Sequence, residues 1–217
     1  MQFRDRAQAG RELAGVLRTR QDEGELPDPV VLALPRGGVA VAEEVARALN
    51  APLDVLVVRK IGAPFQQELG VGALVGGAEP LFDEDILRAL GLTERDLAPV
   101  VERERAELHR RELLYRDGRP APDLRGRTAI VVDDGLATGA TARAALRSLR
   151  RAAPRRTVLA VPVGSPEAVA LLGPEADDVL CLYQPAAFMA VGLWYDDFDQ
   201  LTDADVLRAL RAAADDR

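Results

Sequence analysis

The sequence of 217 residues contains one cysteine, one histidine and one lysine, and each scarcity disfavours a class of site. Because Cys181 is alone, no disulfide can form within the chain, and a reducing cytoplasm is the expected compartment. Cys181 lies in an apolar run, which favours a small core residue. His109 lies in a charged run. A Cys/His metal site, a Ser-His-Asp triad and a Cys-His dyad are therefore all disfavoured.

Long apolar runs are also missing, although 48% of the residues are hydrophobic. No stretch approaches the roughly 20 apolar residues of a membrane-spanning helix. Residues 1–20 carry charges throughout, so no signal peptide is predicted. The net charge of −7 argues against a general nucleic-acid binder and against docking on an anionic membrane. A small anionic ligand remains compatible with this charge, because backbone N–H groups can bind phosphate.

Short apolar runs alternate with helical patterns along most of the chain. Continuous apolar strands separated by helices indicate a parallel sheet that is covered on both faces. We therefore predict an α/β fold with a doubly wound, mainly parallel sheet, in a single domain over residues 1–217. The expected strands are Val30–Leu34, Leu53–Val58, Thr128–Val132, Thr157–Val163 and Asp178–Leu182. The expected helices are Asp5–Arg20, Val39–Leu49, about Thr141–Ala153, Ser165–Leu172 and one that begins near Asp203.

The pattern breaks over an insertion at about residues 62–126. Residues 68–82 alternate in polarity and contain paired glycines, which predicts a β-hairpin. Residues 93–115 form a charged amphipathic pattern that predicts a helix with Thr93 as its N-cap. Its apolar side repeats every seven residues, at Val101, Leu108 and Tyr115. This helix could pack on the insertion or meet a partner chain.

Three segments with polar or small residues follow apolar runs of the predicted sheet. They are Pro35–Gly38, the pair Arg59-Lys60, and Asp133–Thr141. In doubly wound sheets, ligands bind beyond the carboxyl ends of the strands. The coincidence of these segments at strand ends predicts a single binding site.

The segment Ile130–Thr141 carries the most specific chemistry. A buried strand delivers Asp133 and Asp134 to the edge of the sheet, and a loop of small residues leads into a helix. The loop can wrap a phosphate with its N–H groups, and Thr138 and Thr141 can add hydroxyls. The phosphate would repel the two acids, so they should face a ribose diol or a sugar that develops positive charge. A simple helix cap would need only one acid.

Residues 130–141 resemble the phosphoribosyl pyrophosphate signature of the type I phosphoribosyltransferases. Pro35–Gly38 resembles the pyrophosphate loop of that family, whose backbone commonly holds a strained peptide. Arg59-Lys60 resembles the basic pair that ends its second strand, and residues 68–82 occupy the place of its mobile loop. The whole layout is similar to a group of bacterial phosphoribosyltransferases with an enlarged loop insertion and no settled substrate.

The resemblance implies a role for each motif. Asp133 and Asp134 would hold the ribose hydroxyls and are candidate ligands of Mg²⁺, which would bridge substrate oxygens. The 5′-phosphate would lie on Ala137, Thr138, Gly139, Ala140 and Thr141. The pyrophosphate would face Arg36, Gly37, Gly38, Arg59 and Lys60. Asp133, Asp134, Lys60 and Arg36 are the predicted catalytic residues. Lys60 is the only lysine, which suggests that a compact ammonium is required at that position.

The acceptor would lie under a C-terminal hood at about residues 183–217. Phe188, which could stack on a base, and Asp196 are similar to hood residues of hypoxanthine/guanine phosphoribosyltransferases. Trp194 and Tyr195 fit an apolar plug equally well. Two departures weaken an oxopurine assignment: Ala137 replaces the usual acid, and no lysine occurs near residues 161–165. We therefore expect a small nitrogen acceptor of the nucleobase class and name no general base.

Two further hypotheses remain beside a catalytic phosphoribosyltransferase. One is a non-catalytic regulator that senses phosphoribosyl pyrophosphate or nucleotides on the same fold. The other is a hydrolase that uses water as the acceptor. The presence of Arg36, Lys60 and the acid pair favours catalysis. The negative charge and the lack of an appended DNA-binding domain count against a DNA-binding regulator. The resemblance also implies a homodimer.

Overall fold

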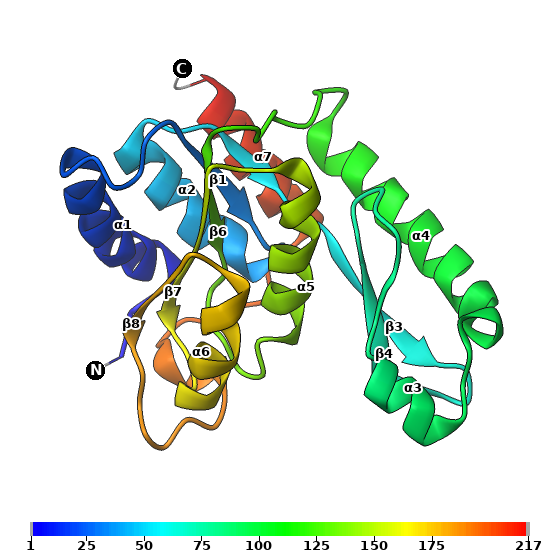
Figure 1. The fold of residues 1–217 in the computed structure, drawn as a ribbon. Coiled ribbons are helices and arrows are strands. Elements are labelled where there is room, and N and C mark those ends of the chain that lie inside the picture. The colour runs from blue at the N-terminus through cyan, green and yellow to red at the C-terminus, as the bar shows by residue number, and fades with distance from the viewer. Residues whose placement is uncertain (1, 216–217) are drawn as a thin grey trace.

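The computed structural model describes residues 2–215, which form a five-stranded parallel sheet and a smaller three-stranded sheet. The main sheet has the strand order β2-β1-β6-β7-β8 (Figure 1). Every neighbouring pair in it is parallel. Its strands are β1 (Pro29–Ala33), β2 (Leu53–Val55), β6 (Thr128–Val132), β7 (Arg156–Val163) and β8 (Asp178–Tyr183). The predicted doubly wound parallel fold is confirmed.

Helices cover both faces of this sheet, as Figure 1 shows. The bounds of the covering helices are α1 (Arg6–Asp22), α2 (Gly37–Leu49), α5 (Ala140–Leu149), α6 (Pro166–Leu172) and α7 (Asp203–Asp215). Alternate residues of β1 and β6 point to opposite sides: Val31 and Ile130 join the core under α1, α2 and α7, whereas Leu32 and Val131 join the core under α5 and α6. Every residue of both strands is buried. Burial on both faces explains why these strands are continuous apolar runs.

The insertion contains an antiparallel sheet and two helices. The strands β3 (Val58–Ala63), β4 (Gln66–Val75) and β5 (Leu81–Phe82) pair in the order β3-β4-β5, and α3 (Glu84–Leu90) and α4 (Glu94–Arg116) follow. The predicted hairpin is β4–β5, whereas α3 was not predicted. Thr93 is the N-cap of α4, as expected, and its N–H and hydroxyl both donate to Asp96. The predicted apolar side of α4 is buried, and the helix packs on β3 and β4.

The predicted second core strand is wrong in one respect. The structure ends β2 at Val55, and the chain leaves the main sheet before it enters β3 at Val58. Arg59 and Lys60 therefore lie within β3, where they pair with Leu74 and Ala73 of β4, and do not end a core strand. The sequence conceals this break because the connecting Val57 is itself buried and apolar.

Short 3₁₀ turns follow α5 (Arg150–Ala152) and α6 (Gly173–Glu175), and a third lies in the hood (Val191–Trp194). Ser165 caps α6, since its side chain accepts a hydrogen bond from the Ala168 N–H. Over residues 2–215, no helix is both long enough and apolar enough to cross a membrane.

Glu175 ties the turn after α6 to α5. Its carboxylate accepts hydrogen bonds from Arg143 and Arg147 at 2.9 Å and from Arg150 at 2.8 Å. The side chain of Glu175 is only 8% exposed. The hydrogen bond from Arg147 is the main cause that lowers the pKa of Glu175 from 4.5 to about 2. The carboxylate therefore stabilises the fold in its ionised form.

Glu175→Gln should lower the free energy of unfolding by about 1–2 kcal/mol at pH 7, because solvent around the partly exposed arginines screens part of the attraction. The pKa of Glu175 is lowered in the folded chain, so its contribution is complete above pH 4.5 and is lost as the pH falls toward 2. Denaturant unfolding at several pH values measures this, with the exposed Glu23→Gln as the control. A deficit that is unchanged between pH 7 and pH 3 would contradict the assignment.

Candidate active site at the carboxyl ends of β1 and β6

The acid pair that follows β6 lies directly against the loop that follows β1. A methyl group added at Gly37 would fall 1.9 Å from Oδ2 of Asp134. One added at Gly38 would fall 2.7 Å from the carbonyl oxygen of Val132 and 2.9 Å from Cα of Asp133. Only glycine leaves room for this approach of the two loops. The fold thus brings two of the three predicted segments together.

The peptide bond between Pro35 and Arg36 is cis, within the loop where the family resemblance implies an unusual peptide. Arg36 is the N-cap of α2, and its Nη1 lies 3.9 Å from Oδ1 of Asp203 at the start of α7. The same oxygen accepts a 2.6 Å hydrogen bond from the Tyr115 hydroxyl. Burial is the main cause that raises the pKa of Tyr115 to about 12. An acid from α7, held by a neutral tyrosine, is therefore the ion-pair partner of Arg36, whose side chain is 34% exposed.

Burial dominates the electrostatics of the acid pair. Desolvation raises the pKa of Asp133 well above its ordinary value, and the neighbouring charge of Asp134 adds to this. Burial also raises the pKa of Asp134, while a hydrogen bond from Arg6 opposes the rise. One oxygen of Asp133 accepts the N–H of Asp134 at 2.9 Å. Two adjacent carboxylates at a strand end form a strong acceptor site for hydroxyl groups or a cation.

The loop after the acid pair is fixed at its base and open at its tip. Leu136 donates to the carbonyl of Val163 at 2.9 Å, and its own carbonyl accepts from the N–H of Ser165 at 2.9 Å. Beyond it, the loop residues Ala137, Thr138, Ala140 and Thr141 are exposed. Gly139 is the N-cap of α5 and has a φ of 75°, a conformation that favours glycine. The N–H of Ala140, the first residue of α5, donates to the hydroxyl of Thr138 at 3.4 Å. This exposed helix start is of the kind that binds anions.

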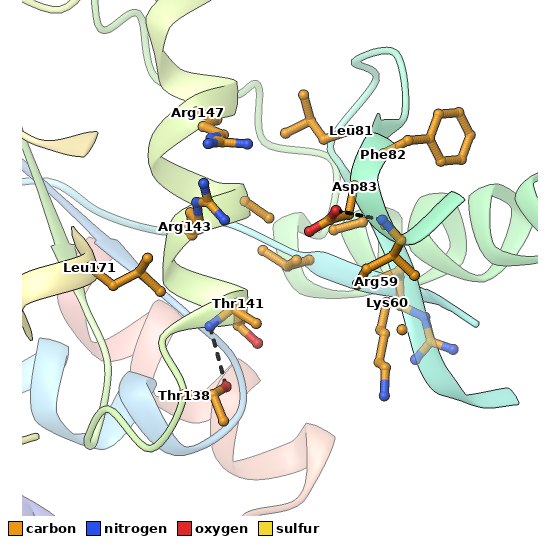
Figure 2. A pocket seen from close by; sticks show the side chains of 17 residues that line it. Arg59, Lys60, Leu81, Phe82, Asp83, Thr138, Thr141, Arg143, Arg147 and Leu171 are labelled. Carbon is orange, nitrogen blue, oxygen red and sulfur yellow. Dashed lines mark hydrogen bonds between the residues drawn. The ribbon is translucent and has the colours of Figure 1, made fainter. Parts of the chain in front are cut away.

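A cavity of about 500 Å³ separates this loop from the insertion. Figure 2 shows Thr138 and Thr141 at the start of α5, with Lys60 of β3 across the cavity. Arg143 and Arg147 line it further along α5. The Lys60 ammonium donates to the backbone carbonyl of Glu68 in β4. The third predicted segment thus faces the predicted phosphate loop across a cavity whose lining does not include the acid pair.

Arg59, the neighbour of Lys60, is engaged elsewhere. Its Nε donates to Oε2 of Glu104 at 3.0 Å, and its guanidinium forms an ion pair with the same carboxylate. Glu104 is a buried acid on α4. This contact gives Arg59 a structural role, because it connects β3 to α4. The place of Arg59 near the pyrophosphate stays a prediction.

The hood packs over the loop after β6. A methyl group at Gly135 would fall 2.6 Å from Cγ1 of Val191. Phe188, half-buried, packs against a cluster that contains Phe3 and the buried Tyr195, whereas Asp196 is exposed. Tyr195 therefore fits the apolar plug that was one of its two interpretations.

Two contacts of the acid pair were not predicted. Arg6, at the start of α1, donates from Nε to Oδ2 of Asp134 at 2.8 Å. The hydroxyl of Tyr195 donates to the backbone carbonyl of Asp134 at 2.6 Å. The partners are 128 and 61 positions apart in the chain. No local pattern carries such pairs, although the resemblance placed the hood near the site.

The model of the phosphoribosyl transferase domain family matches residues 2–181. Two Mycobacterium tuberculosis proteins, each named "Putative phosphoribosyl transferase", are 46% identical to the chain over 211 residues, 97% of its length. The chain spans about half (47%) of the length of these curated relatives.

Solved structures agree on the fold. A crystal structure of a Thermus thermophilus protein is 46% identical, has a TM-score of 0.84, and is matched over 97% of this chain and 98% of that one. A hypothetical protein from Neisseria gonorrhoeae with bound ppGpp is 16% identical, with a TM-score of 0.52 over 98% of each chain, and supports the fold alone. With the family model matched over most of its residues, the chain belongs to the phosphoribosyl transferase domain family.

Proposed function

We propose that the chain transfers the phosphoribosyl group of phosphoribosyl pyrophosphate to a small nitrogen acceptor, of the nucleobase class, and releases pyrophosphate. The observation that supports this best is the meeting of Asp133 and Asp134 with the Pro35–Gly38 loop, beside the exposed start of α5. Acceptors for ribose hydroxyls and donors for phosphates then lie on adjoining strand ends, as a sugar with two phosphate substituents requires. A cytoplasmic homodimer stays a prediction.

In this proposal the donor extends along the sheet edge. Asp133 and Asp134 accept hydrogen bonds from the ribose hydroxyls, and residues 137–141 bind the 5′-phosphate through N–H groups and threonine hydroxyls. The backbone of Gly37 and Gly38 can approach the pyrophosphate closely because neither residue has a side chain. Arg36 and Lys60 would supply positive charge for the pyrophosphate.

Magnesium fits this arrangement. No cluster of three or more metal-binding side chains occurs among residues 2–215. Mg²⁺ is commonly held by one or two carboxylates together with substrate phosphates, and the acid pair supplies such carboxylates. When bound, the ion would neutralise charge on the leaving pyrophosphate. We propose Asp133 and Asp134 as its protein ligands.

The reaction breaks the bond between C1 of the ribose and the pyrophosphate oxygen, which keeps the electron pair. The acceptor nitrogen forms the new bond to C1 with its lone pair and then loses a proton. Positive charge develops on the sugar after the old bond begins to break and before the new bond is complete. The two carboxylates stabilise this charge. The side chains of Arg36 and Lys60 stabilise the leaving pyrophosphate.

A pyrophosphate-release screen tests the proposal. The purified chain is incubated with phosphoribosyl pyrophosphate, Mg²⁺ and single purine, pyrimidine or other amine acceptors. We expect release that depends on one acceptor class and that is lost in Asp133→Asn. Release without any acceptor would indicate a hydrolase. Donor binding without release under every condition would favour a sensing regulator and would overturn the proposed catalysis.

A further inference from the structure

The guanidinium of Arg6 makes three different contacts at the edge of the site. Its Nε donates to Oδ2 of Asp134 at 2.8 Å, and its Nη1 donates to the backbone carbonyl of Asp199 at 2.9 Å. Its central carbon lies 3.8 Å from the ring centroid of Phe198. The Arg6 side chain is 10% exposed and that of Asp134 is 14% exposed. Because both side chains are largely buried, this ion pair is screened less by solvent than an exposed one.

The shape of the guanidinium matters for these contacts. A planar group with several fixed donors can bond an acid with one edge, bond a carbonyl with another, and lay its face on a ring. Arg6 holds Oδ2 of Asp134 and so fixes the orientation of this carboxylate. A lysine could keep the ion pair, but it could not make the other two contacts at once.

Further contacts near Arg6 connect the acid pair to the hood. The N–H of Phe3 donates to the carbonyl of Trp194 at 2.7 Å, and the carbonyl of Phe3 accepts from Asp196 at 2.8 Å. The ring of Phe198 stacks on Tyr195, with the centroids 5.0 Å apart. The chain that leads into α1, the hood and the acid pair therefore form one bonded unit, with Arg6 at the junction.

We propose that Arg6 is a positioning residue that orients Asp134 for the ribose and transmits occupancy of the donor site to the acceptor hood. This inference rests on the proposed function, because it concerns the same donor. Arg6 acts through Asp134 and Phe198 and need not touch the substrate. Removal of a group that orients a binding carboxylate commonly weakens binding at that carboxylate.

The first test is calorimetric titration of the full chain with phosphoribosyl pyrophosphate and Mg²⁺. Arg6→Met keeps the length and apolar body of the side chain but removes its donors. We expect it to weaken donor affinity on the order of tenfold or more. The matched control is Arg4→Met, two residues away, because the side chain of Arg4 is 68% exposed and, among the side-chain contacts described, pairs with its neighbour Asp5 alone. The control should bind the donor like the wild type.

The second test uses Trp194, the only tryptophan, which lies in the hood. Donor binding should change its fluorescence in the wild type and in Arg4→Met. Arg6→Lys should recover most of the donor affinity through the ion pair, yet leave this fluorescence change reduced, since lysine cannot replace the contacts to Asp199 and Phe198. If Arg6 only stabilised the fold, Arg6→Lys would change the donor affinity and the Trp194 fluorescence response together.

The outcomes separate the two proposals. If the wild type binds the donor and Arg6→Met binds it equally or more tightly, the positioning role is overturned while the proposed function stands. If Arg6→Lys restores affinity and the full fluorescence change together, the transmission to the hood is overturned. If the folded wild type does not bind the donor, both proposals fail.

Discussion

The double substitution Asp133→Asn with Asp134→Asn should abolish measurable binding of phosphoribosyl pyrophosphate. Each asparagine keeps the size of the acid but replaces one acceptor oxygen by a donor and removes the charge. Loss of two charge-assisted hydrogen bonds, at about 1.5–3 kcal/mol each, predicts a fall in affinity of about a hundredfold or more. Calorimetric titration in the presence of Mg²⁺ measures this effect.

The fold should survive this change. Burial raises the pKa values of both acids, so their charged forms are costly within the folded chain. Removal of both charges therefore offsets the loss of the Arg6 ion pair, and the unfolding temperature should stay near that of the wild type. Asp85→Asn, at a side chain that is 90% exposed on α3, serves as the control. A folded double mutant with unchanged donor affinity would remove the acid pair from the site.

Gly37→Ala should damage the site with little cost to the fold. The new methyl group would meet the far end of the Asp134 side chain at 1.9 Å, and that carboxylate can swing away. Displacement of the carboxylate by about 1 Å is expected to cost on the order of a hundredfold in activity. Donor affinity and pyrophosphate release both measure this effect.

Gly38→Ala should instead destabilise the fold, because its methyl group would meet backbone atoms of Val132 and Asp133 that cannot move aside. We expect a loss of about 1–3 kcal/mol in unfolding free energy from this overpacking. Gly77→Ala is the matched control for both glycine substitutions, since a methyl group there meets nothing within 4 Å. Equal effects of Gly37→Ala and Gly77→Ala on donor binding would show that the two loops do not act together.

Much of the main sheet could be predicted, because strands buried on both faces are short apolar runs with clear ends. The prediction for β6 agrees with the structure at both bounds, Thr128 and Val132. The break after β2 could not be predicted, since Val57 is as apolar and buried as a strand residue. The helix α3 has seven residues, too few to establish a helical period beside the predicted hairpin.

Some residues of the candidate site could likewise be predicted from the sequence, whereas others could not. Asp133 to Thr141 form a local motif, so their proximity follows from a few residues of chain. The contact of Gly37 with Asp134 follows from the rule that parallel strand ends share an edge. Arg6 depends on how α1 and the hood pack, which no local pattern of charge specifies. The bond between Arg59 and Glu104 likewise depends on the tertiary position of α4.

The placement of Lys60 on β3 has a consequence for the stability of the assembled site. The acid pair belongs to the parallel sheet, whereas the lysine belongs to the antiparallel sheet of the insertion. Proteins open in cooperative parts, and each part has its own free energy of opening. A partial opening confined to the insertion would therefore carry the lysine away while the two carboxylates kept their places. The free energy of this opening would then set the fraction of molecules with a complete site. Protection of the β3 amides against hydrogen exchange would measure that free energy.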